Sequence, residues 1–301
     1  RFLAPLMESW HYTTGLTSHT GEWKGHDLWL RLCVDQSIRS TWTQQKRQPF
    51  YNWIQERGAF EGKRYFADDF DLGQVGINRL WSECVLKASR AELHCGNQHL
   101  GFGFYMPDEP TLLSPPADIC ILLNDDVYLT PGWLEGLVQV MERNPHIGLV
   151  GIPADGAWHE ENNARERWFN DPSLFSDKHV YQYREKLVCY ESHSSGFAWA
   201  CRPEQWLAAG CDKISELEWG GGEFVMADQL RKAGLLTASI YFPLIFHYGG
   251  GGIASGVNVA RRDDAALLEK WYGTGHMHIL HEWWERDNDR STFPPILYDP
   301  E

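Results

Sequence analysis

The feature that most constrains the fold is an apolar run that stops abruptly at acidic residues. Residues 119–123 read Ile-Cys-Ile-Leu-Leu and are followed at once by Asn124, Asp125 and Asp126. An uninterrupted apolar run predicts a strand buried on both faces in the middle of a parallel sheet. Because adjacent carboxylates repel each other, two of them at a strand tip require either solvent or a cation. A solvated turn with a helix-capping Asp is the alternative interpretation.

A helix and a second apolar strand are predicted directly after the acidic triplet. Thr130 and Pro131 predict the helix start, as N-cap and first-turn proline, and Asn144-Pro145 predicts its end. Residues 147–152 again predict a buried strand, so the segment forms a βαβ unit of an α/β fold. The apolar face of the helix is made of Trp133, Leu134, Leu137, Val138 and Met141.

Further elements are predicted on both sides of this unit. The 63–67 strand would deliver Asp68 and Asp69 at its carboxyl end, where ligands collect in open α/β sheets, and the 236–246 strand would deliver His247. Residues 1–27 show no clear period. The remaining predictions are a strand at 28–34, a helix at about 38–56, a helix from Ile77 that buries Trp81 and Val85, a long loop at 89–116, an irregular excursion at 153–190, a strand at 195–201, and helices at 203–209, 223–233 and 265–271.

The charge balance restricts the class of partner. The chain has 27 Lys and Arg against 41 Asp and Glu, a formal net charge of −14. Such a charge opposes binding to nucleic acid or anionic lipid, so no nucleic-acid partner is expected. A small anionic ligand is a different case, because one divalent ion can neutralise a diphosphate locally.

The cysteines and the hydropathy pattern predict the compartment. Seven Cys without a CxxC pair favour reduced thiols over a zinc knuckle or a disulfide scaffold. No stretch approaches the ~18–20 apolar residues that span a bilayer, and the N-terminus has no signal-peptide pattern. A cytoplasmic location and no transmembrane segment are expected, with a leader or anchor removed before Arg1 left open. The oligomeric state is not predicted.

Four segments together resemble one enzyme family. Residues 117–133 (ADICILLNDDVYLTPGW) and 144–151 (NPHIGLVG) resemble the acidic-motif, or DXD-like, region of GT-A-fold glycosyltransferases, especially the inverting family 2. Residues 221–234 (GGEFVMADQLRKAG) and 246–250 (FHYGG) resemble that family's helix with the catalytic acid and its closing His-Gly element. The resemblance implies a GT-A-like, Rossmann-type α/β fold with a mixed, mostly parallel sheet flanked by helices and an extra C-terminal helical segment.

The resemblance implies a site for Mn²⁺ or Mg²⁺ at the acidic triplet. Asp126 matches the last acid of the motif and is the implied direct metal ligand, with Asp125 and Asn124 contacting the donor's ribose or the metal's water. The family motif usually begins with Asp, so Asn124 favours a ribose contact through its amide. His247 matches a position that helps hold the metal or the diphosphate, and a capping His near a sheet edge is the alternative.

The resemblance also implies a base. Glu223 falls where the family has its catalytic Asp, although a first-turn acid favoured by the helix dipole would look the same. Asp228 is a second candidate, about 140° further around the helix. Asp68 and Asp69 match acids that recognise the nucleotide's base or ribose. Apart from the resemblance, Trp219 precedes glycines that let the backbone approach a ligand closely, so Trp219, Gly221 and Gly222 are expected to bind the acceptor; a core Trp is the alternative for Trp219.

These expectations combine into one leading function. Residues 1–260 would form the glycosyltransferase domain, with a nucleotide-binding half at about 28–152 and an acceptor half at about 153–260, and residues 261–301 would form a C-terminal extension. The enzyme would move a sugar from a nucleotide-diphosphate sugar, with a UDP-sugar favoured, to the hydroxyl of a glycan or other acceptor, with inversion. The alternatives are a sugar-phosphate nucleotidyltransferase and a non-catalytic carbohydrate-binding protein derived from a transferase.

Overall fold

The structure is a computed structural model that describes about half of the chain. The described residues are 3–16, 20–29, 31–35, 66–70, 77–90, 92–94, 112–114, 116–124, 127–152, 188–191, 196–217, 221–240, 245–247, 264–273 and 292–299. The predicted 38–56 helix and most of the 153–190 excursion lie outside these ranges, as do Asp125, Asp126 and Trp219.

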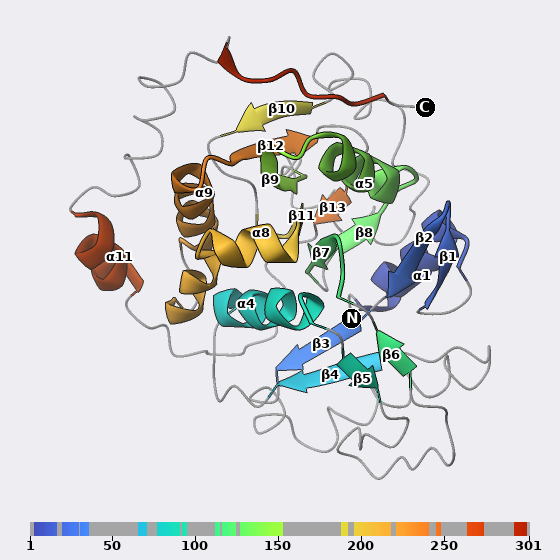
Figure 1. Ribbon diagram of the computed structural model, residues 1–301. Helices are drawn as coiled ribbons and strands as arrows, with labels where there is room; N and C mark the ends of the chain where they lie inside the picture. Colours follow the sequence, from blue (N-terminus) through green and yellow to red (C-terminus); the bar gives the residue numbers. More distant parts are fainter. Residues whose placement is uncertain are drawn as a thin grey trace, which may run out of the picture.

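A five-stranded mixed sheet forms the centre of the molecule (Figure 1). Its strand order is β10-β12-β9-β11-β7, and only β12 and β9 pair in parallel, whereas the other three neighbouring pairs are antiparallel. The predicted mixed α/β class is confirmed, but the expectation of a mostly parallel arrangement is wrong for this sheet. Its strands are β7 (Cys120–Leu123), β9 (Ile147–Gly151), β10 (Val188–Glu191), β11 (Ala198–Cys201) and β12 (Leu236–Ile240).

The strand that ends at the acidic triplet does not lie in the middle of the sheet. Among the described strands, β7 has one hydrogen-bonded neighbour, β11, which separates it from β9. Only Leu122 of its four residues is buried, whereas all five residues of β9 are buried. The run of apolar residues could not distinguish these two places, because it carries no information about which strand pairs alongside it.

One face of the sheet is covered by α5 (Trp133–Arg143), and α1 (Leu3–Thr14) belongs to the same buried cluster. All five residues predicted for the buried face of α5 are buried, so this prediction is confirmed. The predicted N-cap is wrong, because the helix begins after Gly132, whose φ of 87° is left-handed, and not at Thr130. Residues 1–27 were predicted without regular structure, yet α1 packs there against β8 and buries Leu6 and Trp10.

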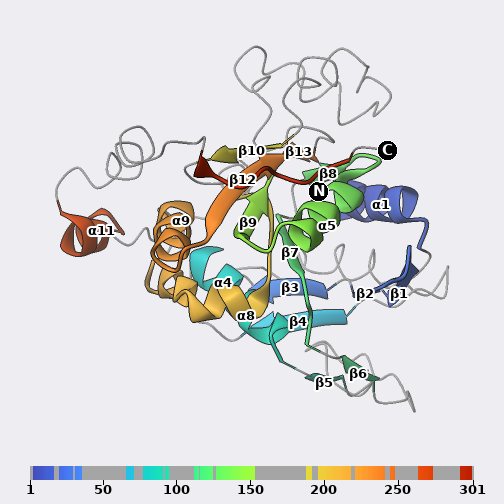
Figure 2. The ribbon, with the colours of Figure 1, turned by 45° about the horizontal axis from the view of Figure 1, so that its top comes forward.

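The opposite face is covered by a second group of helices, which Figure 2 shows grouped below the sheet. Trp81 on α4 meets Trp199 of the sheet edge to face, with 6.0 Å between ring centroids, and Trp199 stacks on Trp206 at 6.5 Å. The predicted helices at 77, 203–209 and 223–233 are confirmed here. The group consists of α4 (Ile77–Ala88), α8 (Pro203–Ala208), the 3-10 helix η3 (Cys211–Glu216) and α9 (Gly222–Lys232).

Four two-stranded sheets complete the described strands. The predicted 28–34 strand is divided, because its first part pairs antiparallel in a hairpin and its second part pairs parallel with β4. The predicted loop at 89–116 contains an antiparallel pair, and the predicted 236–246 strand contributes to two different sheets. The pairs are β1 (Thr20–Trp23) with β2 (His26–Trp29), β3 (Arg31–Asp35) with β4 (Phe66–Phe70), β5 (Glu92–His94) with β6 (Leu112–Ser114), and β8 (Val127–Leu129) with β13 (Ile245–His247).

The C-terminal extension packs on the rest of the protein. Helix α11 (Asp264–Tyr272) contacts α9 through Tyr272, whose ring lies edge to face with Phe224 at 5.0 Å. Residues 292–299 run beside α5 and β10 (Figure 2), where the side chain of Asn144 hydrogen-bonds both backbone groups of Leu297. Among the residues described, no helix combines the length and apolarity required to cross a bilayer.

Candidate functional site

Asn124 lies at the end of β7 and is anchored to the neighbouring strand. Its backbone N–H donates a hydrogen bond of 2.8 Å to the carbonyl oxygen of Phe197, which directly precedes β11. The antiparallel register continues this pairing, with Ala198 opposite Leu123. The turn at Gly196 and Phe197 therefore lies beside the end of β7, next to the position at which the acidic residues follow.

His247 is brought to the same region by a second strand pair. The register of β13 and β8 places His247 opposite Val127, which directly follows Asp126 in the chain. Helix α1 supports this pair, because the backbone N–H of Leu129 donates to the buried Ser9 hydroxyl at 3.0 Å. The backbones of residues 127 and 247 are thus neighbours although 120 positions separate them in sequence. The predicted role of His247 in holding the metal or the diphosphate stays a prediction.

Glu223 lies in the first turn of α9, with its carboxyl group against Gly196. A Cβ atom built on Gly196 would overlap both Oε1 of Glu223 and Cη2 of Trp81. Glu223 is half-buried, and the positive end of the helix dipole favours a carboxylate at this position. Gly196 and Phe197 are consecutive residues of one turn. The Glu223 carboxyl group contacts the first of them, and the end of β7 hydrogen-bonds the second.

The glycines before Glu223 are in close contact with side chains of the chain itself. Gly221 has a left-handed φ of 72°, and a Cβ there would lie 2.6 Å from Cδ1 of Leu268 on α11. A Cβ on Gly222 would overlap Oδ1 of Asn78 on α4. The close approach expected of a bound acceptor at these glycines is made here by Leu268 and Asn78, and acceptor binding by Gly221 and Gly222 stays a prediction.

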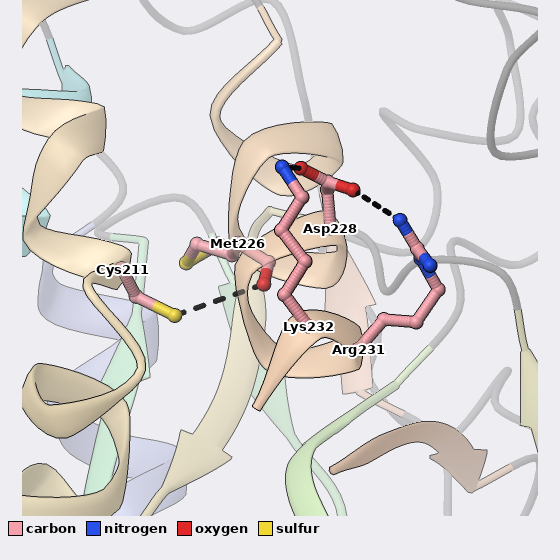
Figure 3. Close-up of polar contacts among 5 residues, drawn as sticks. All are labelled: Cys211, Met226, Asp228, Arg231 and Lys232. Carbon is pink, nitrogen blue, oxygen red and sulfur yellow. Dashed lines mark hydrogen bonds and ion pairs between the residues drawn. The ribbon is translucent and has the colours of Figure 1, made fainter. Parts of the chain in front are cut away.

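Asp228 occupies a different environment on the same helix. Its side chain is 4% exposed and forms ion pairs with Arg231 at 2.7 Å and Lys232 at 2.5 Å (Figure 3). Burial alone would raise the pKa of Asp228, but the hydrogen bonds and charges of Lys232 and Arg231 outweigh it and leave the pKa below the usual value. A buried carboxylate held ionised by two cations is a weak proton acceptor, so this geometry favours Glu223 over Asp228 as a base.

The remaining predicted site residues are placed only in part. Asp68 and Asp69 lie within β4, opposite Cys33 and Val34. The prediction that they follow the strand is wrong, because the strand continues to Phe70. Asp125, Asp126 and Trp219 lie outside the described residues. Within the described ranges, no group of three His, Cys, Asp or Glu side chains could hold a metal ion.

Two residues of the site were not assigned to it from the sequence. Trp81 was predicted only as a core residue of its helix, and Gly196 only as part of the 195–201 strand. The signal for both is a contact between segments far apart in the chain, which no local spacing expresses.

Searches against models of protein families and against curated proteins both find no match for this chain.

Proposed function

We propose that this protein is a metal-dependent glycosyltransferase that uses a nucleotide-diphosphate sugar and inverts the anomeric centre. The observation that carries the proposal is the convergence of three segments predicted to act together. Asn124 hydrogen-bonds Phe197, Glu223 contacts the adjacent Gly196, and His247 pairs with Val127, three residues after Asn124.

The residue types of the predicted site suit a hard divalent cation. Asp126 and Asp125 offer carboxylate oxygens, Asn124 offers an amide oxygen, and His247 offers an imidazole nitrogen. Oxygen-rich sites of this composition suit Mg²⁺ or Mn²⁺ and leave positions for donor phosphates. When bound, the ion would supply neutralisation of the charge that develops on the departing diphosphate.

Glu223 supplies the proton acceptor for the transfer in this proposal. Its carboxylate takes the proton of the acceptor hydroxyl while that oxygen forms a bond to the anomeric carbon of the sugar. The bond from the anomeric carbon to the diphosphate oxygen breaks on the opposite face, and the nucleoside diphosphate leaves. A UDP-sugar is the proposed donor, and a glycan or other hydroxyl compound is the proposed acceptor.

A direct test begins with identification of the donor. A panel of nucleotide sugars with Mn²⁺ is screened by thermal shift, because a ligand at one hundred times its dissociation constant raises the stability by ~2.7 kcal/mol. Transfer or donor hydrolysis is then measured with and without EDTA. Asp126→Ala is expected to lower the rate about 100-fold, which corresponds to roughly 3 kcal/mol.

A matched control separates the metal site from general effects of charge. Asp118 is an exposed carboxylate shortly before β7, and Asp118→Ala is expected to transfer at the wild-type rate. Full activity of Asp126→Ala, or full activity in EDTA, contradicts the proposal. Release of pyrophosphate from a nucleoside triphosphate and a sugar phosphate would favour the nucleotidyltransferase alternative, and glycan binding without nucleotide or metal dependence would favour the binding protein.

A further inference from the structure

Gly196 leaves a space that the Glu223 carboxyl group fills. A Cβ on residue 196 would overlap Oε1 of Glu223 and would lie 3.0 Å from its Cδ. Contacts this close are not tolerated by folded proteins, so an added methyl group must displace one of its neighbours. The Glu223 side chain packs directly on the backbone of residue 196, where only glycine leaves room.

The other wall of this space cannot move easily. The same Cβ would overlap Cη2 of Trp81, which is 7% exposed and is held by its contact with Trp199 in the sheet. Trp199 is itself fully buried and stacks on Trp206. Because this row of indole rings belongs to the packed core, a larger residue at 196 would displace the half-buried Glu223 in preference to Trp81.

The turn at Gly196 also determines where the carboxyl group lies relative to the strand tip. Phe197 accepts the hydrogen bond from the Asn124 backbone, and Gly196 contacts Glu223, so one peptide unit separates the two contacts. The distance between the Glu223 carboxyl group and the end of β7 is therefore determined by a short, hydrogen-bonded piece of backbone and not by a flexible loop.

We propose that Gly196 is a positioning residue, which holds the Glu223 carboxylate at the distance from the end of β7 that aligns the acceptor hydroxyl with the donor sugar. This inference rests on the proposed function. Gly196 does not touch the reacting atoms and acts through Glu223. Reactions between two bound molecules are sensitive to such placement, and a misplacement of about 1 Å can lower the rate about 100-fold.

The test compares kinetic constants of Gly196→Ala with those of the wild type. The kcat of sugar transfer is expected to fall about 100-fold, whereas the KM for the donor should change less than about threefold, because the donor contacts lie at the acidic triplet. Adding Glu223→Asp shortens the side chain by one methylene and makes room for the new methyl group. The double variant is expected to unfold at a higher urea concentration than Gly196→Ala, whereas its kcat should stay low because the shorter side chain also moves the carboxylate.

Two further variants separate positioning from loss of folding. Gly148→Ala is the matched control, because its Cβ would lie 2.7 Å from Cδ2 of Leu230, which is on α9 seven residues after Glu223, so it disturbs the same helix at another residue. It should unfold more easily and keep the wild-type kcat within about threefold. Trp81→Phe removes Cη2, so Trp81→Phe/Gly196→Ala keeps the conflict with Glu223 in a folded protein even if Gly196→Ala alone does not fold.

The outcomes distinguish this inference from the proposed function. A Gly196→Ala protein with wild-type kcat, or a Glu223→Asp addition that does not raise the urea midpoint of Gly196→Ala, overturns the positioning role. Transfer of sugar by the wild type would still support the proposed function in that case. If the wild type transfers no sugar from any donor, yet the urea midpoints show coupling between residues 196 and 223, the proposed function is overturned and the positioning role with it.

Discussion

The two ends of helix α9 hold their carboxylates in opposite ways. At its first turn, Glu223 contacts Gly196, and the preceding glycines contact Leu268 and Asn78, so three separate segments of the chain converge there. In its second half, Asp228 is held by Arg231 and Lys232 of the same helix. One end is built by tertiary contacts and the other by local ones.

This difference shows why a buried acid is not automatically the functional one. Asp228 is the more buried carboxylate, but its charge is already balanced, and α11 adds Tyr272 beside it, whose pKa is raised by burial and by the charge of Asp228. Glu223 is less buried and lies where the strand ends meet. Placement relative to the strand tips therefore separates the two better than burial does.

The largest expected difference between the two ends is catalytic. Glu223→Gln keeps the shape of the side chain and removes its basicity, so kcat should fall about 1,000-fold, or roughly 4 kcal/mol of barrier, with little change in stability. Transfer is measured with the donor and metal that the wild type prefers. A kcat within threefold of the wild type would show that Glu223 is only a first-turn acid.

The next largest difference concerns the glycines at the two ends. Gly221 and Gly234 both have left-handed φ values, 72° and 78°, but nothing lies within 4 Å of a Cβ at Gly234. Gly234→Ala should lower the free energy of unfolding by about 1 kcal/mol from backbone strain alone, and Gly221→Ala by about 2–3 kcal/mol because Leu268 must also move. Urea denaturation measures both free energies of unfolding. Equal losses in the two variants would mean that the contact with Leu268 adds nothing to the cost of Gly221→Ala.

A smaller effect is expected at the local ion pairs. Asp228→Asn should lower the free energy of unfolding by about 1 kcal/mol, a modest value because the side chains of Arg231 and Lys232 are 28% and 53% exposed. The kcat should stay within about threefold of the wild type. A loss of transfer as large as that of Glu223→Gln, in a protein of unchanged stability, would reverse the roles of the two acids.

The smallest effect expected is the pH dependence of the stability that Asp228 contributes. The pKa of Asp228 is lower in the folded protein than the usual 3.8, so the unfolded chain binds the proton more readily. The stability that Asp228 contributes is complete above the unfolded pKa and is lost as the pH falls through the folded pKa. The difference in unfolding free energy between wild type and Asp228→Asn should be constant from pH 7 to about 5 and shrink below about 4; a difference that grows on acidification contradicts the lowered pKa.

The same contrast between local and distant contacts explains which elements could be predicted. Helices α4 and α5 are predicted by apolar spacing and strand β9 by an apolar run, and the structure confirms them. Helix α1 has no such pattern, because one of its buried residues, Ser9, is polar. The Ser9 hydroxyl accepts a hydrogen bond from the backbone N–H of Leu129, which is 120 residues away. The position of β11 between β7 and β9 likewise depends on pairing between distant strands.

The candidate site divides along the same line. Asn124, His247 and Glu223 could be named from motifs, and the described backbone places Asn124 beside Phe197, Glu223 against Gly196 and His247 opposite Val127. The contact of Glu223 with Gly196 could not be predicted, because a glycine before a strand looks the same whether it opens space for a side chain or only forms a turn. The metal, the donor and the acceptor stay predictions.

The two hydrogen bonds between Asn144 and Leu297 have a consequence for the order of events during synthesis. They join residues 153 positions apart, and Gln139 makes a similar pair with Asp299. A ribosome adds about 5–20 residues per second, so α5 would wait roughly 8–30 s for these partners after its own residues are made. Until then the buried side-chain amide of Asn144 lacks two of its hydrogen bonds. In a nascent chain, α5 should therefore become resistant to proteolysis only late in translation.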